Sequence, residues 1–189
     1  MKKFILGILF AAALSSQALA KEAPEKMLQA FPASIGTFEA LQVEVYDEPG
    51  MGASLGYNDM SGIALTLYLY DLGIEDIKDG IASEVIKTAK GQMMEEIYET
   101  SKMGIYTNVK VASEEGIVFE LDKGSKLDVL FVALSYDLPL EGQLLPMLSE
   151  AYVTGLKGQI CKIRVSWPKD IEAGQRKEVI KSILSLLAA

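Results

Sequence analysis

Several short segments alternate apolar and polar residues, the period expected of β-strands with one face in a core. Leu41, Val43 and Val45 alternate with polar neighbours, whereas residues 63–70 are largely apolar on both faces and predict a strand covered on both sides. Glycines at 51–57 predict a weak or bulged strand. Further strands are predicted at 109–112, 117–121, 126–136, 150–154 and 159–167, with hairpin turns at 113–116 and 155–158.

Two other segments repeat apolar residues every three to four positions, as amphipathic helices do. In residues 79–102, an apolar residue recurs at every fourth position from Ile81 to Ile97, which predicts a long helix. Near the C-terminus, Asp170 is suited to cap a second helix that continues to about Leu187. A short helix is also predicted at residues 24–31.

This order of elements predicts the α+β class. Consecutive strands joined by tight turns form an antiparallel sheet, and strands that are apolar on both faces need cover on both sides. We therefore expect an antiparallel sheet covered by the long central helix and the C-terminal helix, a helix–sheet–helix sandwich. The predicted division is a signal peptide at 1–20, a lead-in at 21–37 and one α+β domain at 38–189.

Residues 1–20 have the layout of a secretory signal peptide. Lys2 and Lys3 precede an uncharged, mostly apolar run at 4–14, and residues 18–20 give a small-x-small exit with cleavage expected after Ala20. The apolar run is shorter than the roughly 20 residues of a spanning helix. We expect a periplasmic or secreted protein with no membrane span after cleavage.

The charge and the reactive residue types exclude several classes of function. Loss of Lys2 and Lys3 would change the formal net charge from −8 to −10, which disfavours nucleic-acid binding. The chain contains no histidine, so Ser-His-Asp and Cys-His catalysis and most zinc, haem and copper sites are excluded. No metal-ligand spacing or phosphate-binding loop occurs, and we expect no cofactor, no metal and no enzymatic activity.

The one cysteine, Cys161, has two readings. It is either a reactive or bridging thiol, or a buried small apolar residue on one face of a strand. The strand pattern around it favours burial.

A set of tyrosines and two cations forms the first candidate site. If their strands share one sheet, some of these residues would line a concave aromatic face able to bind an anionic or planar ligand. The alternative is that the tyrosines pack under a helix with exposed hydroxyls. The residues are Tyr46, Tyr57, Tyr68, Tyr70, Lys162 and Arg164.

The second candidate is residues 137–148, interpreted as a proline-containing loop that is unusually rich in leucine. It would be an apolar contact surface or a lid over a ligand cleft, with Leu140, Leu144 and Leu145 as contact residues. The alternative is a loop that folds back and fills the core.

The element order resembles the PsbP/Mog1-like fold and a set of uncharacterised secreted bacterial proteins that share it. The resemblance spans about residues 36–188 and includes the hairpin stretch Tyr152–Gly158 leading into Lys162-Ile163-Arg164. Photosystem-associated members use histidine and an N-terminal segment in partner contacts, and a chain without histidine does not share that role. The resemblance implies a binding or accessory role.

Three functions are carried forward from the sequence. The first is a non-enzymatic periplasmic accessory or partner-binding protein, whose partner would be an envelope protein. The second is a small-molecule binding protein with an apolar and aromatic pocket under residues 137–148. The third is a histidine-free enzyme that uses carboxylates, tyrosine or lysine.

Overall fold

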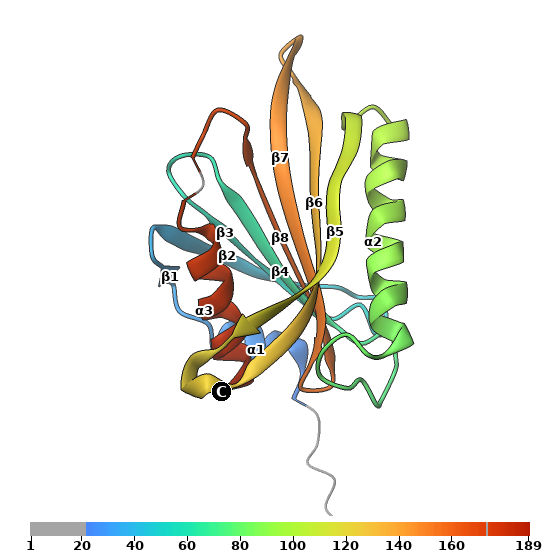
Figure 1. Ribbon diagram of the computed structural model, residues 1–189, viewed down its shortest axis with the longest axis vertical. Coiled ribbons are helices and arrows are strands. Elements are labelled where there is room, and N and C mark those ends of the chain that lie inside the picture. Colours follow the sequence, from blue (N-terminus) through green and yellow to red (C-terminus); the bar gives the residue numbers. More distant parts are fainter. Residues whose placement is uncertain (1–21, 173) are drawn as a thin grey trace, which may run out of the picture.

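An eight-stranded sheet organises the residues that the computed structural model describes, 22–172 and 174–189 (Figure 1). The strand order is β1-β2-β3-β4-β8-β7-β6-β5, and every neighbouring pair is antiparallel. The strands are β1 (Ser34–Ile35), β2 (Phe38–Val45), β3 (Ala53–Asn58), β4 (Ala64–Tyr70), β5 (Thr107–Glu120), β6 (Lys126–Leu140), β7 (Gln143–Leu156) and β8 (Gln159–Pro168). The helices are α1 (Pro24–Gln29), α2 (Glu84–Lys102), the 3-10 turn η1 (Asp122–Gly124) and α3 (Arg176–Ala188). The predicted α+β class and antiparallel sheet are confirmed.

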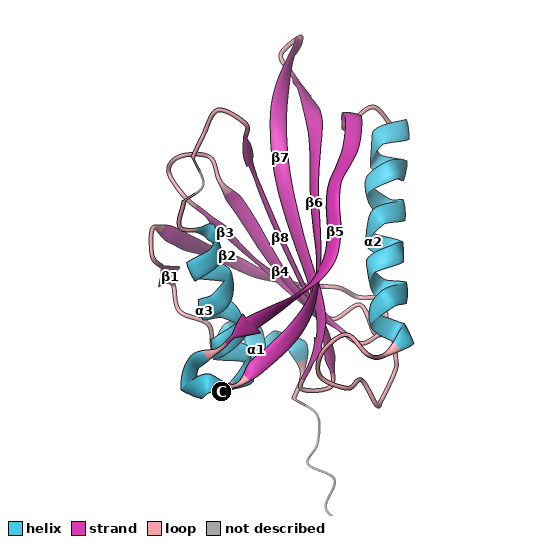
Figure 2. Cartoon of the chain, in the orientation of Figure 1, coloured by secondary structure: helices cyan, strands magenta, loops and turns pink. Residues whose placement is uncertain are grey.

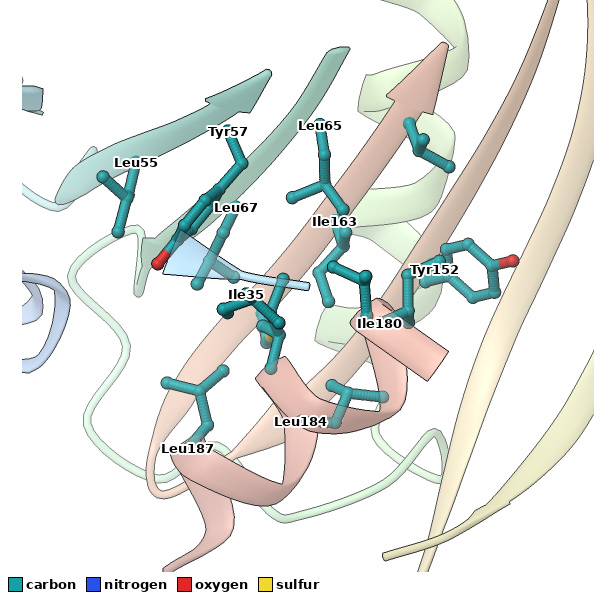
Figure 3. Close-up of a cluster of buried hydrophobic side chains, with 14 of the residues drawn as sticks. Ile35, Leu55, Tyr57, Leu65, Leu67, Tyr152, Ile163, Ile180, Leu184 and Leu187 are labelled. Atoms are coloured by element: carbon teal, nitrogen blue, oxygen red, sulfur yellow. The ribbon is translucent and has the colours of Figure 1, made fainter. Parts of the chain in front are cut away.

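Different helices pack on the two faces of the sheet, as the separate positions of α2 and α3 in Figure 2 show. Side chains alternate between the faces along each strand. On one face, α1 and α3 close a core that includes Leu65, Ile163 and Ile180 (Figure 3). On the other face, α2 contacts β5 and β7, and its Ile86 is buried with Val153 of β7.

The long helix begins later than the sequence pattern predicted. Ser83 caps α2 by accepting the backbone N–H two residues on at 3.4 Å. Asp79 and Gly80, predicted to be helical, instead join the β7–β8 turn region, where Gly80 exchanges backbone hydrogen bonds with Gly155 at 2.9 and 3.0 Å. A Cβ on Gly155 would lie 2.0 Å from the carbonyl oxygen of Lys78, so this close approach requires glycine.

The predicted cap of the last helix is also wrong. α3 begins at Arg176 after Gln175, and Asp170 lies in the turn that follows β8. The N–H of Ile171 donates to the carbonyl of Pro168 at 3.0 Å, so the chain turns once before it becomes helical.

Residues 113–116 are not a turn, and the predicted hairpin around them is wrong. They lie inside β5, a continuous edge strand that pairs only with β6. The register with β6 shifts between Val111 and Ser113, so the strand has a bulge next to the predicted turn and continues through it. Most residues of β5 are exposed, so this edge strand does not need to alternate apolar and polar residues. Its polar residues at 113–116 therefore resemble those of a turn.

Residues 137–148 are not a loop. They form the ends of β6 and β7, joined by Glu141 and Gly142, whose φ values of +50° and +80° suit a two-residue hairpin turn. Pro139 lies beyond the pairing of β6 with β5, and Pro146 lies beyond the pairing of β7 with β8. Each proline therefore stands where its strand has one neighbour and needs no second ladder bond.

The predicted lead-in at 21–37 contributes to the core from α1 and β1. Leu28 is buried, and Ile35 is buried with it under α3. The predicted signal peptide, residues 1–20, lies outside the described residues. Over 22–172 and 174–189, no helix is both long and apolar enough to span a bilayer.

Candidate functional site

An open cleft of about 640 Å³ lies between α2 and the sheet face formed by β4 and β8. We call it the tyrosine cleft. The sheet side is mainly aromatic and apolar, with one cation. Its residues are Tyr46, Met51, Tyr68, Tyr70, Leu72 and Lys162.

The antiparallel register brings these residues together. Tyr68 of β4 lies opposite Lys162 of β8 and, on its other side, opposite Ser54 of β3. Tyr70 is two residues along β4 from Tyr68, so both rings point to the same face. The hydroxyls of Tyr46 and Ser54 lie 2.9 Å apart and hold the Tyr46 ring at the edge of this row.

The helix side combines a small apolar floor with an acidic rim. Ala89 and Met93 of α2 are buried where they line the cleft, and Ala89 is too short to fill the space above the sheet. Glu95, Glu96 and Glu99 stand along the exposed side of the helix. The cleft therefore has an apolar interior and a negatively charged border.

Lys162 is the cation at the floor of the tyrosine cleft. Its side chain is 14% exposed, and its Nζ lies 4.5 Å from the ring centre of Tyr68 and 5.7 Å from that of Tyr70. Glu96 Oε2 is 3.6 Å away. Burial lowers the pKa of Lys162, while the Glu96 carboxylate acts in the opposite direction. The ammonium is thus held by aromatic faces and one rim carboxylate.

The hydroxyls of Tyr68 and Tyr70 stay protonated over the physiological range. Burial raises the pKa of Tyr70, and the Glu96 carboxylate adds to the effect. Burial also raises the pKa of Tyr68. These hydroxyls offer neutral hydrogen-bond donors and apolar ring faces, not phenolate charge.

Arg164, the second predicted cation, does not line the tyrosine cleft itself. It lines an adjoining cavity of about 130 Å³, which we call the inner chamber. Tyr68, Met93, Glu96 and Lys162 border both spaces. Tyr68, Lys162 and Arg164 therefore lie on one face of the sheet, as predicted. Lys162 borders both cavities, whereas Arg164 borders only the inner chamber.

Tyr57 does not belong to this site. It faces the α3 side, is fully buried there, and its hydroxyl donates to the carbonyl of Pro32 at 2.8 Å. Tyr57 packs on the helical side as the alternative interpretation expected, but its hydroxyl is bonded to Pro32 and is not exposed.

Leu140, Leu144 and Leu145 are not part of the cleft either. They lie at the tip of the β6–β7 hairpin, where they border a separate cavity of about 200 Å³. Leu140 and Leu144 are 55% and 56% exposed. No residue of 137–148 lines the tyrosine cleft, so the prediction of a pocket under that segment is wrong. The cleft lies between α2 and β4 instead.

No pattern in the sequence pointed to Met51, Leu72 and α2 as parts of the cleft. Met93 belongs to the four-residue apolar repeat that predicted the helix, and it is both buried and cleft-lining. The position of α2 over the sheet decides this role, and periodicity alone does not give that position.

Cys161 lies on the opposite face, buried in the α3 core. Burial raises the pKa of its thiol to about 12, so thiolate chemistry is suppressed. The burial predicted for this residue is observed. Among the described residues, no three Cys, Asp or Glu side chains group as metal ligands do.

Comparison with known proteins adds a likeness in fold. No protein-family model matches the chain, and no curated protein matches it. A solved structure, the solution structure of cyanobacterial PsbP (CyanoP) from Synechocystis sp. PCC 6803, is similar with a TM-score of 0.41 and 15% identity, over 82% of this chain and 81% of that chain.

Proposed function

We propose that this chain is a non-catalytic binding protein that holds a small, largely apolar and aromatic molecule in the tyrosine cleft. The observation that carries the proposal is the unfilled volume of about 640 Å³ between tyrosine rings and α2, with a cation at its floor. Ligand sites in proteins typically measure about 300–1,000 Å³ and combine apolar walls with a few polar groups.

The chemistry of the walls favours a planar ligand. Tyr68 and Tyr70 present ring faces, and aromatic ligands stack on such faces or meet them edge-on. Met51 and Met93 supply flexible, polarisable contacts that adapt to a ring. Lys162 gives the cleft one polar end, which would orient the ligand.

Small-molecule binding is favoured over docking of an envelope protein at the hairpin tip. The cleft is bordered by the sheet and α2, whereas the cavity beside Leu140 and Leu144 measures only about 200 Å³. An accessory role of this protein would then consist of carrying or sensing the ligand. The export expected from residues 1–20 remains part of the proposal, and it places the ligand in the periplasm or outside the cell.

A non-catalytic role is supported by the groups present. The chain has no histidine, and burial raises the pKa values of Tyr68 and Tyr70, which keeps both hydroxyls neutral. The Glu96 carboxylate is paired with Lys162, so it is not positioned as a general base toward a bound molecule. No second acid–base pair is positioned among the described cleft residues.

The test is a titration with N-phenyl-1-naphthylamine, a neutral aromatic probe that fluoresces in apolar surroundings. We expect saturable binding that weakens about tenfold in Tyr68→Ala, because loss of an aromatic contact and its buried area costs roughly 1.4 kcal/mol. Tyr98→Ala is the matched control, since Tyr98 is on the same helix as Met93 but exposed and outside the cleft. Absence of binding, or equal loss in both variants, would overturn the proposal.

A further inference from the structure

We propose that the ligand of the tyrosine cleft carries an anionic group, and that this group occupies the inner chamber beside Arg164. This inference rests on the proposed function, because it names the chemical class of the molecule that the cleft holds. The ligand would be an amphipathic acid, with an aromatic or apolar body in the cleft and a carboxylate or similar anion at its inner end.

The two spaces are placed so that one molecule can occupy both. Tyr68 and Lys162 border the cleft on one side and the inner chamber on the other, with Met93 and Glu96 of α2 above them. The chamber measures about 130 Å³ and is bordered by two cations, so it has room for a small polar group such as a carboxylate. A ligand body stacked on Tyr68 therefore has room to extend its end group toward Arg164.

Arg164 has hydrogen-bonding capacity that the described residues do not use. Its Nε donates to Ser149 Oγ at 3.2 Å, which fixes the plane of the guanidinium. Its Nη2 is buried and has no hydrogen-bond partner among the described residues. A buried, charged donor without an acceptor destabilises the protein, so an acceptor that bonds to this guanidinium from the chamber is stabilised.

Aromatic rings surround this guanidinium where a carboxylate is usual. The Cζ of Arg164 lies 5.4 Å from the ring centre of Tyr106 and 5.7 Å from that of Tyr136. No carboxylate of the described residues forms an ion pair with Arg164. The rings orient the cation without neutralising it, and its fork of N–H donors matches a planar carboxylate.

The charges that border the inner chamber do not balance. Lys162 and Arg164 supply two positive charges, and Glu96 supplies one negative charge, already 3.6 Å from the Lys162 Nζ. The remaining chamber residues are uncharged. One ligand anion beside Arg164 would bring the chamber to neutrality, whereas a neutral ligand would leave a charge that is costly to desolvate.

The chain itself shows the usual solution to a partly buried guanidinium. On the other face of the sheet, Arg176 meets Glu150 through two hydrogen bonds of 3.0 Å each, and Tyr152 donates to the same carboxylate at 2.6 Å. Arg164 has no such protein carboxylate. We infer that the ligand supplies it.

The test compares two probes with the same ring system, the anionic 1-naphthaleneacetate and the neutral 1-naphthaleneacetamide, as displacers of bound N-phenyl-1-naphthylamine. We expect the acid, which is ionised at neutral pH, to displace the neutral probe at about tenfold lower concentration than the amide, because a charge-assisted hydrogen bond is worth roughly 1.4 kcal/mol or more. Equal potency of acid and amide on the wild-type protein would overturn the inference while leaving the proposed function intact. Failure of the neutral probe to bind would overturn both.

Three variants assign the preference to the chamber. Arg164→Gln should make acid and amide equally potent while neutral-probe binding persists, and Arg164→Lys should retain part of the preference because it keeps a charge. Thr100→Glu, which places a carboxylate on the helix wall of the chamber, should abolish the preference without removing the arginine. A preference for the acid that survives in both Arg164→Gln and Thr100→Glu would contradict the assignment.

Discussion

The two faces of the central sheet are built from the same strands but are completed in different ways. Under α3, Ile163 and Tyr152 lie in a closed core, and the Arg176 guanidinium donates hydrogen bonds to both carboxylate oxygens of Glu150. Under α2, the tyrosine cleft stays open, and Arg164 keeps a buried nitrogen unpaired among the described residues. The comparison indicates that the closed face contributes more to the stability of the fold, whereas the open face holds the proposed binding site.

The difference arises from where the helices pack. α3 and α1 together cover the apolar side of β3, β4 and β8. α2 contacts β5 and β7, so the other side of β4 is only partly covered and its tyrosines border open space. β8 serves both faces, with Cys161, Ile163 and Val165 on one side and Lys162 and Arg164 on the other.

Removal of apolar volume should therefore cost more on the closed face. Ile180→Ala empties a fully buried position on the inner side of α3, and we expect a loss of about 4 kcal/mol in the free energy of unfolding. Met93→Ala opens into an existing cleft, and we expect about 2 kcal/mol because it creates little new enclosed cavity. Urea denaturation of both variants measures the difference, and an equal or reversed order would break the comparison.

Replacement of each arginine should likewise destabilise the protein more on the closed face than on the open face. Arg176→Met leaves the Glu150 carboxylate, whose side chain is 10% exposed, without its cation, and we expect a loss of about 3 kcal/mol. Arg164→Met removes a guanidinium that no described carboxylate pairs with, and we expect a change below about 1 kcal/mol. Chemical denaturation at neutral pH decides this, and a larger loss for Arg164→Met would show that its charge is structurally paired.

The smallest expected effect concerns pH. Burial lowers the pKa of Lys162 below 10.5, so the unfolded chain holds this proton more tightly than the folded chain. Stability contributed by this group therefore rises as pH increases toward 10.5 and falls as pH decreases through the lowered value. Relative to Lys162→Met, the wild-type protein should gain stability from neutral pH to 10.5, as thermal unfolding at several pH values would show. The opposite slope would mean that Glu96 dominates over burial.

Local patterns were sufficient for much of the fold. A run that is apolar on both faces identified β4, alternation identified β8, and the four-residue spacing identified α2, because each of these elements turns apolar residues to a core. Patterns failed where no core faces the residues. The exposed edge strand β5 contains polar residues at 113–116 that resemble a turn. Residues 137–148 resemble a loop because they contain prolines, but a strand tolerates proline where it has only one neighbour.

The site was predictable only in part, for a related reason. Parity along a strand places Tyr68 with Tyr70 and Lys162 with Arg164, so each pair shares a face once the strands are known. The adjacency of β4 and β8 is a long-range pairing that connects the middle of the chain to its end. The position of α2, which makes a cleft from these residues, depends on packing that no local pattern encodes.

The most direct test of the open face is a titration of nitrogen-15-labelled protein with N-phenyl-1-naphthylamine, followed by amide chemical shifts. The account predicts shifts at Tyr68, Met93 and Lys162, around the tyrosine cleft, and none at Tyr152 and Ile180 under α3. Shifts confined to the α3 face or to the hairpin tip, or a spectrum that does not change at saturating probe, would contradict it.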